Sequence, residues 1–134
     1  MTIEVMWRTV EDDRWREHRE LIRDAESLAR VVGLLEDPRV DGATAHHPSH
    51  EGFSEMVFGV RNGRGALFYT DAEGAWYTLG EDEEGGEERE PPVWFEVDFP
   101  PRAEVPAELV AVALDEYRQT GQRPTVVRWQ PMEL

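Results

Sequence analysis

The most constraining feature of the sequence is the Asn62-Gly63 pair, which lies between two apolar runs. Both residues tolerate the positive φ angles of a two-residue hairpin turn, so the pair predicts that the flanking runs form antiparallel strands. In the run before it, Met56, Phe58 and Val60 alternate with other residues and so share one face. We expect three consecutive strands, at residues 54–61, 65–70 and 75–79, with the second turn at 71–74. The centre of the chain is therefore predicted to be an antiparallel meander.

Two segments outside the meander have helical spacing. Asp24 is a plausible N-cap for a helix that runs to about Asp37 and is stopped by Pro38. Its buried stripe is expected to be Leu28, Val31, Val32 and Leu35. A second helix is expected to start at Pro106 and to end before Gly121.

The remaining segments complete a single α+β domain over residues 1–134. Residues 3–9, 93–99 and 124–129 are predicted strands, and residues 11–20 are expected to form a polar connection or an exposed helical turn. In 93–99, Val93, Phe95, Val97 and Phe99 alternate on one face, which leaves Trp94 on the other. The order is then β-α-β-β-β-β-α-β, a mainly antiparallel sheet with two helices packed on one face. The other face could meet water or a partner.

The charge of the chain is large and unevenly distributed. The formal net charge is −15, and residues 71–108 hold 13 acids against only Arg89 and Arg102. Such a surface repels nucleic acid and anionic membranes, and it attracts basic proteins. The alternative is that the acids only keep the protein soluble.

The sequence has no cysteine, and its N-terminus lacks the basic start and apolar run of a signal peptide. No apolar stretch approaches the ~20 residues needed to span a bilayer. We therefore expect a cytoplasmic protein that is not bound to a membrane.

Histidines supply the one candidate metal cluster, which consists of His46, His47, His50 and Glu51. The spacing does not match a zinc-binding helix, and Pro48 interrupts any helix that could aim two imidazoles together. Ser49 has no nucleophile elbow around it. We expect no cofactor, no metal and no catalysis, although a small metal-dependent hydrolase that uses these histidines stays open as an alternative.

Four segments resemble a known family: residues 99–106, 116–121 and 123–129, and the hairpin segment 71–76. Their order, with Arg123-Pro124 and Trp129 near the end, is similar to the first family of immunity proteins from bacterial polymorphic toxin systems. The resemblance implies an α+β fold, no enzymatic activity and a cognate toxin as the partner, often a nuclease or a deaminase that acts on nucleic acid. We interpret the motif residues Pro106, Gly121 and Trp129 as residues that stabilise the fold and not as contacts with the partner.

We expect the acidic meander and its loop to cover the basic cleft of such a toxin, with aromatic side chains as anchors. The candidate contacts are Asp71, Glu73, Trp76, Glu81, Asp82, Glu83, Glu84, Glu87, Glu88, Glu90 and Trp94. Two other readings stay open, a structural module that oligomerises through its open sheet face and a nucleic-acid mimic that acts on host proteins. The sequence leaves the oligomeric state undecided between monomer and dimer.

Overall fold

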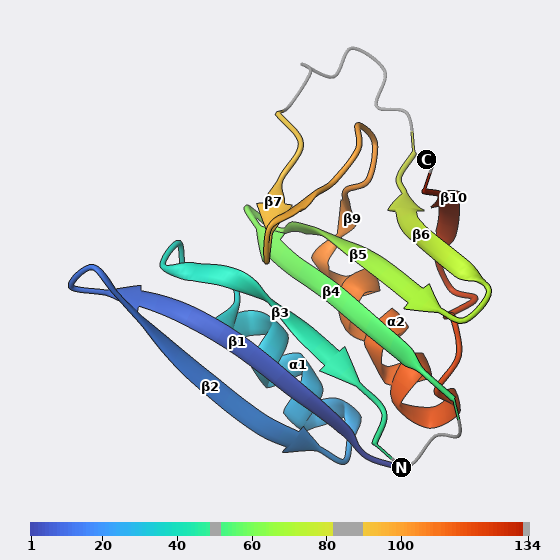
Figure 1. Ribbon diagram of the computed structural model, residues 1–134, viewed down its shortest axis with the longest axis horizontal. Helices are drawn as coiled ribbons and strands as arrows, with labels where there is room; N and C mark the ends of the chain where they lie inside the picture. Colours follow the sequence, from blue (N-terminus) through green and yellow to red (C-terminus); the bar gives the residue numbers. More distant parts are fainter. Residues whose placement is uncertain (49–51, 82–89, 133–134) are drawn as a thin grey trace.

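The computed structural model describes residues 1–48, 52–81 and 90–132. The strands are β1 (Ile3–Glu11), β2 (Arg14–Ile22), β3 (Val40–His46), β4 (Ser54–Arg61), β5 (Arg64–Asp71), β6 (Gly74–Leu79), β7 (Val93–Trp94), β8 (Val97–Asp98), β9 (Val105–Pro106) and β10 (Arg128–Pro131). The helices are α1 (Ala25–Leu34) and α2 (Ala107–Thr120). The main sheet has the order β10-β6-β5-β4-β3-β1-β2, with β9 beside β5, and its pairings are antiparallel. Both helices cover the same face of this sheet (Figure 1), so the expected α+β architecture is confirmed.

The central meander matches its prediction closely. Asn62 and Gly63 have φ angles of 53° and 76°, as a hairpin turn between β4 and β5 requires. Trp76 and Tyr77 on β6 lie on opposite faces, as alternation demands, because Trp76 packs against the core under the helices and Tyr77 against a second core. The last strand begins later than predicted, at Arg128, and pairs with β6.

The N-terminal third corrects the prediction for residues 11–20. These residues form most of β2, which pairs with β1 from Ile3↔Ile22 to Glu11↔Arg14. Strand β2 is the edge of the sheet, and Ile22 is its one buried residue, so its sequence lacks the apolar alternation that signals a strand. Strand β3 has no counterpart in the expected order, yet it lies inside the sheet between β1 and β4.

Each helix has one of its expected caps, Asp24 at the start of α1 and Gly121 at the end of α2, whereas Pro106 is the N-cap of α2 and not its first residue. The Asp24 carboxylate accepts the Ser27 backbone N–H at 2.7 Å, which lowers the pKa of Asp24 and caps α1. The helix ends at Leu34, before the expected Asp37, because the following residues form turns. Gly121 ends α2 with a φ angle of 68°. None of the helices among the described residues is long and apolar enough to cross a membrane.

A second, smaller core lies on the sheet face opposite the helices, and it corrects the predicted strand 93–99. Phe95 and Glu96 have φ angles of 50° and 63°, so the chain reverses there and forms the short hairpin β7–β8. This turn leaves Val93 exposed and places Trp94 inside, where its side chain is only 7% exposed. The Trp94 ring lies against Gly42 and Gly59, where a Cβ atom would come within 2.6 and 2.3 Å of the Trp94 side chain.

Candidate partner-binding surface

Three of the expected contact residues lie together at the turn between β5 and β6. One oxygen of the Asp71 carboxylate accepts the Glu73 backbone N–H at 2.8 Å, and the other accepts the Tyr69 hydroxyl at 2.9 Å. Burial and this contact with Asp71 together raise the pKa of Tyr69, which therefore remains a hydrogen-bond donor. The Asp71 carboxylate is thus held in a fixed position near the exposed Glu73.

Trp76 completes this group and lines a hollow of about 650 Å³ with Asp71 and Glu73. The hollow is formed by three distant parts of the chain: the start of β4, the β5–β6 turn and the segment 121–129 after α2. Arg123 places its guanidinium 4.0 Å from the centre of the Trp76 ring. Trp129 lies on the same wall and donates its indole N–H to the Pro124 carbonyl at 2.7 Å. The hollow thus combines aromatic walls with charges of both signs.

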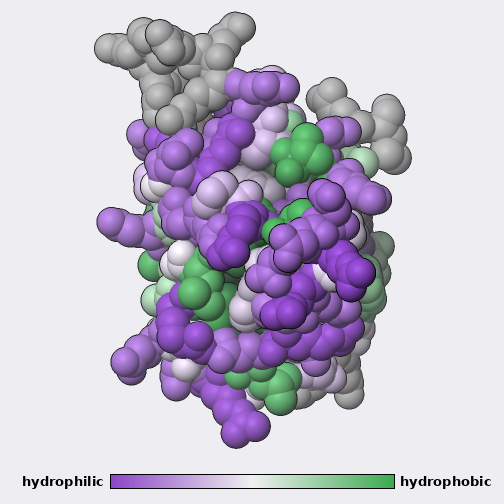
Figure 2. Space-filling model, turned by 90° about the vertical axis from the view of Figure 1, so that its left-hand side faces the viewer, coloured by the Kyte–Doolittle hydropathy of each residue, from purple (hydrophilic) through white to green (hydrophobic). Residues whose placement is uncertain are grey.

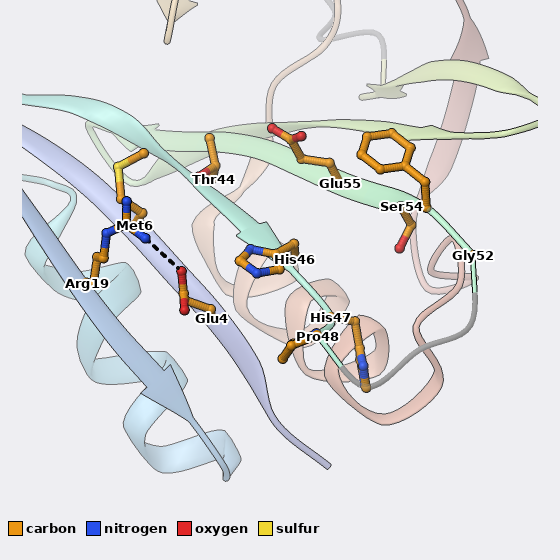
Figure 3. A pocket seen from close by; sticks show the side chains of 11 residues that line it. Glu4, Met6, Arg19, Thr44, His46, His47, Pro48, Gly52, Ser54 and Glu55 are labelled. Atoms are coloured by element: carbon orange, nitrogen blue, oxygen red, sulfur yellow. Dashed lines mark hydrogen bonds and ion pairs between the residues drawn. The ribbon is translucent and has the colours of Figure 1, made fainter.

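A second hollow, of about 470 Å³, lies on the sheet face that the helices leave open (Figure 3). The strands β1, β3 and β4 bring Glu4, His46 and Glu55 to it, because Glu4 pairs with His46 and Glu55 precedes Met56, the partner of Ala45. Arg19 on β2 donates to Glu4 at 3.2 Å. Residues 52–54 line both hollows, so the start of β4 separates them.

Comparison with known proteins identifies the family of this chain. Residues 9–131 match the family described as Immunity protein Imm1. The chain belongs to the Imm1 family. A search of curated proteins found no match. Two of the segments on which the sequence resemblance rests, 71–76 and 123–129, lie on the same hollow of this Imm1 protein. Trp129 and Arg123 therefore contribute to a surface feature as well as to the architecture.

The other expected contacts of the Imm1 chain lie away from this hollow. Glu81 and Glu90 are exposed and flank residues 82–89, at the far end of β6 from Asp71. Strand β6 has six residues and so extends about 20 Å. Asp82, Glu83, Glu84, Glu87 and Glu88 lie outside the described residues. The expected contacts thus fall into two groups, one at each end of β6.

Trp94 belongs to neither group. It was expected on the face opposite the apolar side of its strand, but the turn at Phe95 and Glu96 places its ring in the second core with Phe99. A partner could reach this ring only if the β7–β8 hairpin moved. Trp94 is therefore not part of the candidate surface.

The two described histidines of this segment, His46 and His47, do not converge. His46 is exposed at the end of β3, whereas His47 is buried with Nε2 at 2.9 Å from the Arg118 carbonyl oxygen, and the two rings point apart (Figure 3). His50 and Glu51 lie outside the described residues. Within residues 1–48, 52–81 and 90–132, no group of three His, Asp or Glu side chains could hold a metal ion. The described part of the chain therefore gives no structural support to a metal-dependent hydrolase that uses these histidines.

The side of the molecule that carries the β1–β2 edge is mainly hydrophilic (Figure 2). Its apolar areas are small and separated by polar ones. The aromatic residue of β2, Trp15, is 59% exposed and packs on Arg8, whose guanidinium also contacts Phe95 and Asp41. Charged side chains along an edge strand hinder the addition of a further strand, so we interpret this side as a solvated edge.

Proposed function

We propose that this chain binds a toxin of a bacterial polymorphic toxin system and neutralises it without catalysis. The Imm1 match over residues 9–131 carries the proposal, because an immunity protein acts by protecting a cell from a toxin. The proposed site of action is the cytoplasm, and the activity needs no cofactor. Nucleic acid and membranes are not among the proposed partners.

The mechanism that we propose is occlusion of a basic active-site cleft. A toxin that cuts or deaminates nucleic acid needs a positively charged surface to hold phosphates. Residues 71–108 of this chain carry a net charge of −11, which can steer such a toxin toward the immunity protein. Carboxylates would then lie where phosphates bind during catalysis. The proposed contacts are Asp71, Glu73 and Trp76, together with the acidic residues 81–90.

Co-expression tests this proposal directly. The toxin domain encoded next to this chain should stop growth of a bacterial host when expressed alone, and growth should recover when this chain is expressed with it. The purified proteins should co-elute from a size-exclusion column, and the chain should inhibit the toxin in a stoichiometric manner. A noncognate Imm1 protein serves as the control. Absence of both rescue and co-elution would refute the proposed function.

A further inference from the structure

Phe53 is an exposed aromatic residue at the start of the internal strand β4. Its side chain is 62% exposed, and it lines both hollows described above. An aromatic side chain in this position is a ridge between two depressions. Aromatic residues that a rigid surface displays next to depressions commonly supply most of the binding energy in protein interfaces.

The chain around Phe53 is held firmly by the next residue. Ser54 is buried, and its Oγ lies 2.9 Å from the Tyr117 hydroxyl and donates to the Gly121 carbonyl at 3.3 Å. Ser54 also pairs in register with Asp71, so Phe53 lies beside the β5–β6 turn. A residue displayed from such a fixed backbone loses little conformational freedom when a partner binds.

Carboxylates lie on both sides of Phe53. Glu55 lies at the hollow on the open sheet face, and Asp71 and Glu73 lie at the hollow on the helix side. None of these three forms an ion pair with a described residue. Arg19 is by contrast already paired with Glu4 and Glu17. The hollow on the helix side also holds Arg123, whose guanidinium lies over the Trp76 ring. Carboxylates therefore outnumber bases among the charges next to Phe53 that form no ion pair with a described residue.

Given the proposed function, we infer that Phe53 is the aromatic anchor of the toxin interface. The ring enters an apolar depression on the toxin, and Arg or Lys side chains around that depression enter the two hollows beside Phe53. Basic side chains fit there because carboxylates and aromatic rings both stabilise cations. The centre of the docking surface then lies at the end of the sheet where β5 turns into β6.

Trp15 provides a matched control for Phe53. It is almost equally exposed, at 59%, but it lies near the β1–β2 turn at the opposite end of the sheet from the start of β4 (Figure 1). Alanine at either position removes one exposed aromatic side chain. If any exposed ring could bind the toxin, both variants would lose affinity to a similar extent.

The experiment measures the affinity of Phe53→Ala and Trp15→Ala for the purified neighbouring toxin domain, which carries an inactivating active-site substitution. We expect Phe53→Ala to raise Kd about 30-fold or more, mainly through faster dissociation, because hot-spot residues contribute about that factor. We expect Trp15→Ala to change Kd less than about threefold, as for residues outside a hot spot. Thermal unfolding should show that both variants fold.

A charge variant gives a second, independent measurement. Glu55→Gln with Glu73→Gln removes two carboxylates beside Phe53, and Glu26→Gln with Glu108→Gln removes two exposed carboxylates from the helices. The first pair should weaken toxin binding at least tenfold more than the second, although the net charge is the same. Equal effects of the two pairs would contradict the docking surface.

The outcomes separate this inference from the proposed function. A toxin that binds the unchanged chain but tolerates Phe53→Ala would overturn the docking surface and leave the immunity function standing. A toxin that does not bind the unchanged chain would overturn both.

Discussion

Individual glycines determine where the largest aromatic side chain of the second core lies. Trp94 packs over Gly42 and Gly59, and a Cβ atom at Gly59 would lie 2.3 Å from two atoms of the indole ring. Gly42 also has a φ angle of 72°, which other residues rarely adopt. The indole ring can lie there only because Gly42 and Gly59 have no side chains. The position of Trp94 therefore depends on residues more than 30 positions away in the sequence.

Gly59→Ala should therefore displace the Trp94 ring and destabilise the protein. Forcing a methyl group into a filled core costs about 1–3 kcal/mol. The matched control is Gly33→Ala in α1, where an added Cβ meets no atom of the described residues within 4 Å. That control should be neutral or stabilise the protein by up to about 1 kcal/mol, because alanine is the better helix former. Urea unfolding measures both, and equal stabilities of the two variants would contradict the packing described for Trp94.

Among the elements, those with local signals were predictable and those defined by distant contacts were not. The Asn62-Gly63 turn, the Asp24 cap and the Gly121 cap each require a particular residue at one position, so the sequence reveals them. Strand β2 escaped prediction because an edge strand can be polar on both faces. The segment 93–99 was misassigned because the turn at Phe95 and Glu96 breaks its apparent alternation.

The cap of α1 makes a prediction about pH. The folded-state pKa of Asp24 lies below its unfolded value, since its carboxylate accepts the Ser27 N–H. The stabilisation is therefore present above the unfolded pKa of about 3.9 and is lost as the pH falls through the folded pKa. Asparagine caps equally well but does not titrate. Asp24→Asn should reduce the loss of stability between pH 5 and pH 2.

The control for that variant is Asp13→Asn in the β1–β2 turn, which removes one carboxylate at a position with a φ angle of 62° that asparagine tolerates. Urea midpoints at pH 5, 4, 3 and 2 give the comparison. Asp13→Asn removes the same charge without altering the cap, so the difference between the two variants reports the contribution of the cap to stability. If the urea midpoints of Asp24→Asn changed with pH as those of this control do, the charge of the cap would contribute nothing to the pH dependence of stability.

For the whole molecule, the sequence indicated some of the residues that we propose for the docking surface but not Phe53, the anchor that we propose for it. Asp71, Glu73 and Trp76 were identifiable because two acids and an aromatic residue lie close together in the sequence at a predicted turn. Phe53 was missed because a single aromatic residue in a polar stretch carries no periodic signal. The hollow on the helix side arises only when the start of β4, the β5–β6 turn and the segment after α2 meet. The hollow on the open face arises only when β1, β2, β3 and the start of β4 lie side by side. No pattern within one stretch of the sequence shows that these distant segments lie together in the fold.

The two ends of β6 should consequently contribute to different rate constants. Long-range attraction depends on net charge and is screened by salt, whereas an apolar anchor acts after contact. Replacing Glu83, Glu84, Glu87 and Glu88 by Gln removes four of the 13 acids in residues 71–108. We expect this variant to bind the toxin about tenfold more slowly at low salt, with a weaker dependence on ionic strength.

Dissociation should stay within about twofold of the unchanged chain, because charges at the rim of an interface act mainly on the association rate. Phe53→Ala should show the reverse, with faster dissociation and an unchanged salt dependence of association. Surface plasmon resonance between 50 and 500 mM salt resolves both constants. If the four-residue variant associated at the normal rate, steering by residues 82–89 would be excluded. If it instead dissociated much faster, these residues would lie in the buried centre of the interface and not at its rim.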